Sequence, residues 1–256
     1  MSEEVIHNKN ILVIIPARMG SSRFPGKPME KILGKPMIGH VYDNVKKNKI
    51  ISDVAVATCD KQIFDYIKNI GGLPIMTSDE HERASDRCAE ALLKIEKNKN
   101  IKYDIVVMVQ GDEPMIEPEM ITEAIKPMLN DEEILVINLQ GKIISEKEFQ
   151  DPNCIKVVCD LNSNALYFSR LPIPSNTRNI TVSTGKQICV IPFRRDFLLT
   201  YNKLKPTPLE IAESIDMMRV LEHGLKVYMV STSFNTFAVD TIEDLKKVEK
   251  LLIIAK

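Results

Sequence analysis

The segment that follows the first apolar run carries three cationic side chains, Arg18, Arg23 and Lys27, with Gly20 and Gly26 among them. Guanidinium and ammonium groups donate to phosphate oxygens, and glycine lets backbone N–H groups approach the same oxygens. The spacing therefore predicts a site that binds a polyphosphate. Taken alone, the same residues also fit a surface loop with incidental charge.

Carboxylates follow two other predicted strands. Asp112 lies in the segment 110–114, directly after the apolar residues 105–109. A carboxylate that faces a polyphosphate can hold Mg²⁺, whereas an Asp at this place can also cap the following turn. Asp240 has the same two interpretations, a magnesium ligand or the N-cap of a helix that begins at Thr241, with Glu243 at the capping-box position.

Two further segments are rich in polar side chains. Residues 77–87 can bind a base and a ribose, or they are a solvated helix start with Asp79 or Ser85 as N-cap. Arg170 and the charged residues of 208–222 are candidates for sugar contacts. Their alternative interpretation is a charged exposed face, because Leu209, Ala212, Ile215, Met218 and Leu221 form a separate apolar stripe.

The first half of the chain alternates apolar strands with amphipathic helices, which predicts a largely parallel α/β sheet covered on both faces. We expect strands at 11–15, 54–57, 73–76 and 105–109, and helices after Pro36, after Asp60 and over 85–96. The right-handed crossover rule brings their loops to the carboxyl edge of the sheet, where open α/β folds bind ligands.

The second half is richer in strands. We expect a hairpin at 155–159 and 165–168, a strand at 186–191, helices at 195–204 and 208–222, a strand at 226–230 and a helix from Thr241. The polar loop 172–179 can reach into a site or a partner subunit. We therefore predict one domain over residues 1–256, with a smaller β-rich part at about 140–205.

Composition limits the function classes. Lys and Arg total 34 against 35 Asp and Glu, so the net charge of −1 predicts no nucleic-acid or membrane partner. The five cysteines show neither a zinc-site nor a disulfide pattern. No apolar run approaches the roughly 20 residues of a membrane span, and we expect a cytoplasmic protein. Motifs of serine hydrolases, zincins, P-loop ATPases and NAD enzymes are missing from the sequence, which favours magnesium-dependent transfer on a nucleoside triphosphate.

Several motifs together resemble one family, the CTP:3-deoxy-manno-octulosonate cytidylyltransferases, also called CMP-Kdo synthetases. The resemblance runs in one register from about residue 11 to 250. It is carried by IPARMGSSRFPGKP at 15–28, GKPMI at 34–38, VQGDEPM at 109–115, DPN at 151–153, ALYFSR at 165–170, TPLE at 207–210 and VDTIEDL at 239–245.

The resemblance implies a Rossmann-like nucleotidyltransferase, usually a homodimer, that transfers CMP from CTP to the anomeric hydroxyl of an ulosonic acid and releases pyrophosphate with Mg²⁺. It assigns the reacting centre to Arg18, Lys27, Gln110 and Asp112, and Mg²⁺ to Asp112 and Asp240. It assigns nucleotide binding to Ala17, Arg18, Gly20, Ser21, Arg23, Lys27, Ser85, Arg87 and Gln110, and sugar-acid binding to Arg170 and Glu210. Arg83, Gln187 and Asp216 are further candidates for sugar-acid contacts. The resemblance also implies that the part at about 140–205 serves the sugar side and dimerisation.

The chain departs from the family pattern at two places. HERASDR at 81–87 stands where these enzymes have His-x-Ser-Gly-Thr-Asp/Glu-Arg, and Gln187 stands where they have a histidine that contacts the sugar acid. The expected acceptor is therefore Kdo or a modified or different ulosonic acid. Two alternatives remain: a catalytically silent nucleotide-binding module, and an enzyme for a sugar phosphate whose second phosphate would be bound by Arg83, Arg178 or Arg194.

Overall fold

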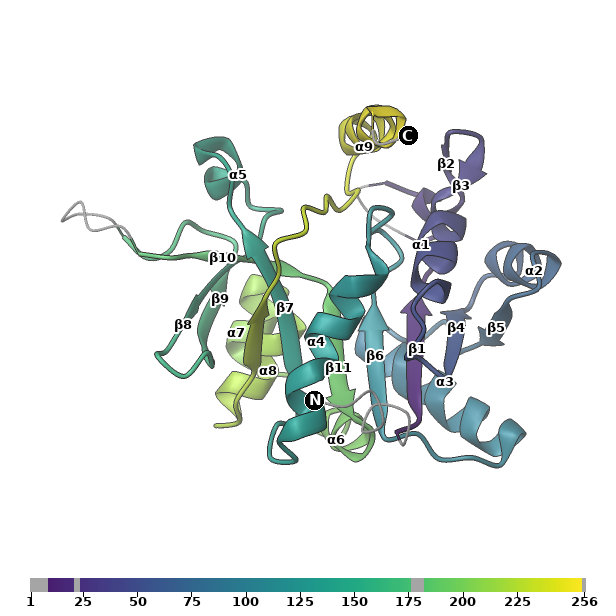
Figure 1. The fold of residues 1–256 in the computed structure, drawn as a ribbon, viewed down its shortest axis with the longest axis horizontal. Coiled ribbons are helices and arrows are strands. Elements are labelled where there is room, and N and C mark those ends of the chain that lie inside the picture. The colour runs from purple at the N-terminus through teal and green to yellow at the C-terminus, as the bar shows by residue number, and fades with distance from the viewer. Residues whose placement is uncertain (1–8, 21–23, 176–181, 255–256) are drawn as a thin grey trace.

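The computed structural model describes residues 9–20, 24–175 and 182–254. Its central sheet has the strand order β11-β6-β1-β4-β5 (Figure 1). The strands β1 (Ile11–Pro16), β4 (Asp53–Thr58), β5 (Leu73–Met76) and β6 (Ile105–Val109) are parallel, and β11 (Val190–Arg194) joins β6 antiparallel. The expected mostly parallel α/β sheet is confirmed. Chain order reverses between β1 and β6, where Rossmann-like sheets bind ligands.

Helices cover both faces of this sheet. The helices α1 (Met37–Lys46), α2 (Lys61–Asn69) and α4 (Pro118–Asn130) share one apolar cluster with Val13 and Val107. On the other face, α3 (Ala84–Lys99) and α6 (Arg195–Tyr201) pack with Leu12 and Met108. Burial from both sides explains why every residue of β1 is inaccessible and why the strand is a continuous apolar run.

A second sheet has the order β12-β7-β10-β8-β9. Its strands are β7 (Ile137–Lys142), β8 (Lys156–Cys159), β9 (Ala165–Ser169), β10 (Gly185–Ile188) and β12 (Tyr228–Ser231). The short helix α5 (Glu146–Gln150) follows β7, while α7 (Pro208–Glu213) and α8 (Asp216–Glu222) precede β12. The expected hairpin is β8 and β9, and four of these strands come from residues 137–188.

Two predicted elements are each divided in the structure. The strand expected at 186–191 is two strands, because β10 pairs in the second sheet and β11 pairs in the central sheet, with Cys189 between them. The helix expected at 208–222 is α7 and α8, because Ser214 adopts a left-handed conformation with φ 54° and ends α7. Both breaks bring a backbone segment to the carboxyl edge of the central sheet.

The C-terminal segment returns to the N-terminal part of the chain. Here α9 (Ile242–Ile254) lies beside the small hairpin of β2 (Lys31–Ile32) and β3 (Lys35–Pro36) (Figure 1). The N–H of Val239 donates to the carbonyl of Asp112 at 2.9 Å, which places Asp240 beside the end of β6. Thr241 and Asp244, rather than Asp240 and Glu243, make the reciprocal capping bonds of α9. The N-cap interpretation of Asp240 is therefore wrong.

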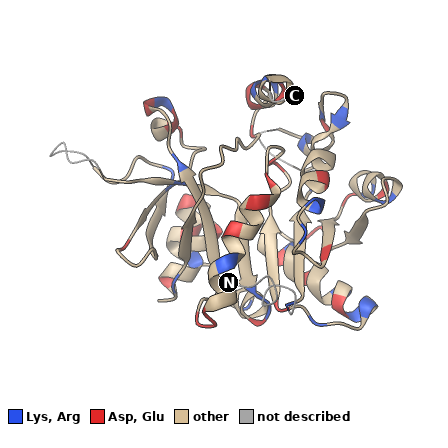
Figure 2. Cartoon of the chain, viewed as in Figure 1, with Lys and Arg blue, Asp and Glu red and all other residues tan. Residues whose placement is uncertain are grey.

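Acidic and basic residues are interspersed over most elements (Figure 2). Within the described residues, no helix combines the length and the apolar character needed to cross a membrane.

Candidate active site

Asp60, which follows the neighbouring strand β4, holds the loop after β1 in place. The carboxylate of Asp60 accepts a hydrogen bond from the N–H of Met19 at 2.8 Å. Asp60 stands at the N-cap position of α2, but its side chain makes no capping bond there and supports the loop instead. Gly26, at φ 75°, closes the loop by donating its N–H to the carbonyl of Met19 at 2.9 Å. Only glycine adopts this conformation without strain.

Lys27 brings the two predicted magnesium carboxylates together. Its Nζ lies 2.8 Å from Asp112 Oδ2 and 3.3 Å from Asp240 Oδ1. Burial alone lowers the pKa of Lys27, but the two carboxylates outweigh burial and the pKa is raised. The side chain is therefore an ammonium at neutral pH. Two acidic groups and one cation thus meet at the carboxyl ends of β1 and β6.

A cavity of about 370 Å³ opens at this edge of the sheet. Its lining includes Ala17, Arg18, Gly20, Lys27, Arg83, Arg87, Gln110, Asp112 and Ser214. The structure therefore brings together most residues predicted to bind the nucleotide. Ser21 and Arg23 lie outside the described residues. Ser85 is fully buried and donates to Asp216 Oδ2 at 3.2 Å, so it stands behind the cavity wall.

Arg87 lies in the wall of this cavity and is only 2% exposed. Its Nη1 donates to Thr77 Oγ1 and to the carbonyl of Ser78. Nη2 is buried and has no partner among the described residues. Arg87 therefore contributes a positive charge to the cavity wall, and its binding of the nucleotide stays a prediction.

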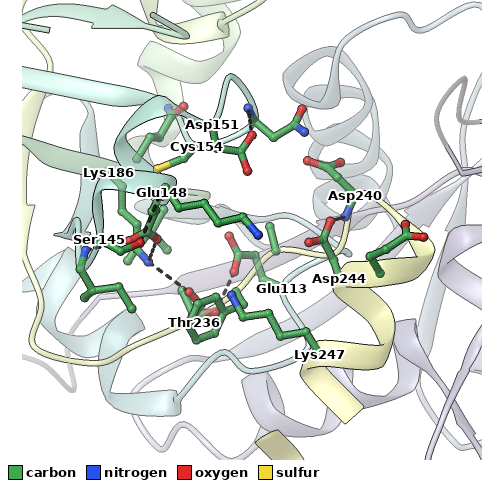
Figure 3. A pocket seen from close by; sticks show the side chains of 18 residues that line it. Glu113, Ser145, Glu148, Asp151, Cys154, Lys186, Thr236, Asp240, Asp244 and Lys247 are labelled. Carbon is green, nitrogen blue, oxygen red and sulfur yellow. Dashed lines mark hydrogen bonds and ion pairs between the residues drawn. The ribbon is translucent and has the colours of Figure 1, made fainter. Parts of the chain in front are cut away.

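A second cavity, of about 500 Å³, has Asp240 in its wall (Figure 3). Lys186 and Glu148 lie along one side of it, with 2.6 Å between Lys186 Nζ and Glu148 Oε1. Asp240 and Asp244 lie on the opposite side. Glu113 stands in its wall and accepts a hydrogen bond from the hydroxyl of Thr236 at 2.8 Å. Burial, helped by the charge of Asp112, raises the pKa of Glu113 to about 7.

Sequence reasoning did not single out Lys186, Glu148 or Thr236. They come from three segments that fold together only through the second sheet and the return of the chain to α9. A signal was available for Lys186 alone, since it is the one charged residue of the strand expected at 186–191.

The residues predicted to bind the sugar acid do not all lie in one cavity. Arg83 lies in the wall of the smaller cavity, where its Nη1 is 3.4 Å from Asp216 Oδ1 and its Nε is 3.6 Å from Glu210 Oε1. Glu210 is fully buried and accepts both bonds of the Arg219 guanidinium, at 2.6 and 2.7 Å. Burial raises the pKa of Asp216. The structure therefore places Glu210 and Asp216 behind Arg83.

The interpretation of 208–222 as an exposed charged face is wrong. Glu210 and Arg219 are buried as a pair, while Leu209 and Ala212 of the expected apolar stripe are exposed. The interruption at Ser214 changes the helical register, so the two halves of the predicted stripe do not share one face.

Gln187 lines the larger cavity, and its amide is held by a buried neighbour: Nε2 donates to Asn138 Oδ1 at 2.5 Å. The guanidinium of Arg170 donates to the main-chain carbonyls of Pro152, Glu213 and Ser214. Arg194, considered for a second phosphate, donates to the carbonyls of Met128, Asp131 and Ile134 and lines neither cavity. Arg178 lies outside the described residues.

Glu90 anchors the loop before α3, and we expect it to make stability depend on pH. Its carboxylate accepts from the N–H of Ser78 and from Lys94, and it contacts His81. Burial alone raises the pKa of Glu90, but these partners outweigh it and lower the pKa to about 2. The stabilisation is therefore complete above the unfolded pKa near 4.5 and is lost as pH falls toward 2.

We expect Glu90→Gln to reduce the free energy of unfolding at pH 7 by about 1 to 2 kcal/mol, less than the full shift because Glu90 is partly exposed. Urea unfolding of both proteins at pH 7 and pH 3.5 measures this effect. The difference in free energy of unfolding between the wild type and Glu90→Gln should be smaller at pH 3.5 than at pH 7. An equal difference at both pH values would contradict the stabilising role of the Glu90 carboxylate.

The sequence-family comparison agrees with this geometry. The family model described as cytidylyltransferase matches residues 12–229. The chain belongs to the cytidylyltransferase family. Curated relatives within it include two proteins named 3-deoxy-manno-octulosonate cytidylyltransferase. One, from Geobacter metallireducens, is 44% identical over 94% of this chain and 97% of its own length. The other, from Geobacter sulfurreducens, is 41% identical over 94% and 99%.

Solved structures place this cytidylyltransferase in the same fold. A CMP:2-keto-3-deoxy-manno-octonic acid synthetase complexed with CTP has a TM-score of 0.88 at 35% identity, covering 96% of this chain and all of that one. A cytidylyltransferase from Leptospira borgpetersenii, at 18% identity and a TM-score of 0.63, shares the fold, covering 96% and 87%. The predicted Rossmann-like nucleotidyltransferase fold and the predicted family are confirmed.

Proposed function

We propose that this enzyme transfers CMP from CTP to the anomeric hydroxyl of Kdo or a closely related ulosonic acid for surface polysaccharide synthesis. The observation that carries the proposal is the meeting of Lys27, Asp112 and Asp240 between two cavities at the carboxyl edge of the sheet. The names of the relatives, which match this chain over nearly its whole length, supply the identity of the sugar acid.

The smaller cavity is proposed for CTP. Arg18, Lys27 and Arg87 bring three positive groups to it, and Gln110 adds an amide. The carbonyl of Cys189 accepts the N–H of Gln110 at 3.1 Å, which fixes this residue at the end of β6. Binding here would orient the triphosphate and stabilise the charge that builds up during displacement. Gln110, Lys27 and Asp112 would then face the reacting phosphorus.

The larger cavity is proposed for the sugar acid, with Gln187 and Lys186 in its wall. The anomeric oxygen attacks the α-phosphorus, a new oxygen–phosphorus bond forms, and the bond to the bridging oxygen breaks. Pyrophosphate leaves, and the hydroxyl proton is released. No covalent intermediate with the protein is needed, because positioning and charge neutralisation supply the rate enhancement.

Mg²⁺ fits the residues present between the cavities. Asp112 and Asp240 present carboxylate oxygens toward one position now taken by the Lys27 ammonium, and paired carboxylates with substrate phosphates are the donor set that Mg²⁺ prefers. Asp112 and Asp240 would hold the ion. When bound, Mg²⁺ neutralises phosphate charge and polarises the phosphorus–oxygen bond. Lys27 would then turn to the phosphates.

We also propose a homodimer formed through the second sheet. Large apolar side chains are more than half exposed in this part of the chain: Ile144, Leu166, Leu171 and Val182. A second copy covering them would remove this apolar surface from water. Light scattering of the purified protein tests the assembly state. The cytoplasmic location and the single domain over 1–256 with a sugar-side part at about 140–205 remain predictions.

The purified enzyme should release pyrophosphate from CTP when Mg²⁺ and Kdo are present, and ATP, GTP or UTP should serve poorly. A coupled phosphate assay with a panel of sugar acids measures both preferences. CTP binding by calorimetry without pyrophosphate release for any acceptor would indicate a silent module. Turnover with a sugar 1-phosphate but not with sugar acids would overturn the acceptor assignment.

A further inference from the structure

Lys156 on β8 is a buried lysine whose hydrogen bonds all end on main-chain carbonyls. Its side chain is fully inaccessible, and Nζ donates to the carbonyls of Asp151 at 2.8 Å, Cys154 at 2.6 Å and Arg170 at 2.6 Å. An ammonium has three N–H donors, so all of them end on main-chain oxygens. Burial lowers the pKa of Lys156, while the charges of Asp151 and Glu213 act against this shift. The three carbonyls that it binds come from two segments, 151–154 and Arg170.

Arg170 continues the same arrangement. Its Nε donates to the carbonyl of Glu213 at 2.6 Å, Nη1 to that of Pro152 at 2.9 Å, and Nη2 to that of Ser214 at 3.4 Å. Its own N–H donates to the Glu213 carboxylate at 2.9 Å. Lys156 and Arg170 thus bind six main-chain carbonyls between them, and we call this pair the carbonyl clamp.

Five of the six clamped carbonyls belong to two short segments, one beside each cavity, and the sixth is that of Arg170 itself. Residues 151–154 line the larger cavity with the side chains of Asp151, Asn153 and Cys154. Ser214, at the junction of α7 and α8, lines the smaller cavity, and its hydroxyl lies 3.5 Å from Arg83 Nη1. Pro152 and Ser214 therefore share one guanidinium although they are far apart in the sequence.

We propose that the carbonyl clamp positions residues 151–154 against the α7–α8 junction, and so sets the place of the acceptor relative to the nucleotide. This inference rests on the proposed function in one respect, namely that the larger cavity takes the sugar acid. Lys156 and Arg170 act as positioning residues, because their donors reach backbone rather than either cavity. A displacement of about 1 Å between the two reactants is enough to lower the rate strongly.

The test compares Lys156→Met and Lys156→Arg in the full-length enzyme. With one or more carbonyls released, residues 151–154 lose their support, and we expect KM for Kdo to rise about 10-fold or more in Lys156→Met. The dissociation constant for CTP should change less than about 3-fold, since the CTP cavity keeps its charged residues. Lys156→Arg, which retains the charge, should recover part of the loss.

Arg194→Met is the matched control. Arg194 also donates to three main-chain carbonyls, but these belong to residues 128–134 and line neither cavity. It should lower stability and leave KM for Kdo unchanged. Equal KM values in folded Lys156→Met and in the wild type would overturn the proposal.

Hydrogen exchange without ligands provides a readout that is independent of turnover. The amides of Asn153 and Cys154 bond within the clamped segment. They should exchange about 10-fold faster or more in Arg170→Gln, and faster by a smaller factor in Lys156→Arg. Unchanged exchange in both variants would overturn the clamp even if Lys156→Met fails to fold. A wild type that never releases pyrophosphate with Kdo would refute the proposed function, while the exchange result would still decide the clamp.

Discussion

Asp112→Asn and Asp240→Asn should each lower the turnover of CTP with Kdo by about 10²- to 10³-fold, the loss typical for removal of one electrostatic group from a reacting centre. The substitution keeps the size of the side chain and removes the charge that both carboxylates direct at Lys27. The Mg²⁺ concentration for half-maximal rate should rise in both variants. Initial rates of pyrophosphate release over a magnesium titration measure both effects.

The control for this prediction is Asp43→Asn. Asp43 pairs with Lys35 on the surface, so removing its charge should change the rate less than about 2-fold. Near-normal turnover in both site variants would refute the magnesium assignment. A loss in only one of them would leave that carboxylate as the sole ligand from this pair.

Arg219→Met should lower the free energy of unfolding by about 3 to 5 kcal/mol, because it leaves the Glu210 carboxylate charged and unpaired in the core. Glu210 and Arg219 are at most 4% exposed and share two hydrogen bonds, and the guanidinium also stacks 4.9 Å from the Tyr201 ring centre. The nearest other cation, Arg83, stands 3.6 Å from one oxygen and does not replace both bonds. Urea denaturation at pH 7 measures the loss.

The double variant Arg219→Met/Glu210→Leu should regain most of this stability, since apolar replacement of both partners removes the buried charge. Lys102→Met is the exposed control. It breaks a pair with Asp196 in which both side chains are more than half accessible, and it should cost no more than about 1 kcal/mol. A loss of similar size in Lys102→Met and Arg219→Met would contradict the role of burial.

The sequence predicted best those elements whose apolar pattern matches the place that they take in the fold. The runs 73–76 and 105–109 are strands with the expected bounds, because both are short, apolar and paired in the central sheet. The run 105–109 is buried throughout, whereas 73–76 lies at the sheet edge and is partly exposed. The helix α4 and the strand β7 were not expected. Pro118 and Pro127 interrupt the apolar periodicity of α4, although Pro118 at the first turn starts the helix and Pro127 lies near its end.

The candidate site was predictable where its residues follow a strand of the central sheet. Lys27, Gln110 and Asp112 do so, and the crossover rule alone brings them to one edge. The environment of Glu210 was not predictable, because the left-handed Ser214 turns the charged side of α7 inward. The roles of Asp60 and Lys156 depend on contacts with distant backbone, which no local pattern records.

The pairing of Lys27 with Asp240 joins positions 213 residues apart in the chain. During synthesis on a ribosome, the central sheet and the nucleotide cavity can form before the segment that carries Asp240 has emerged. Asp240 lies just before α9, so the second carboxylate of the proposed reacting centre is made long after the segments that carry Lys27 and Asp112. A nascent chain that has not yet exposed Asp240 would hold the nucleotide cavity without this carboxylate.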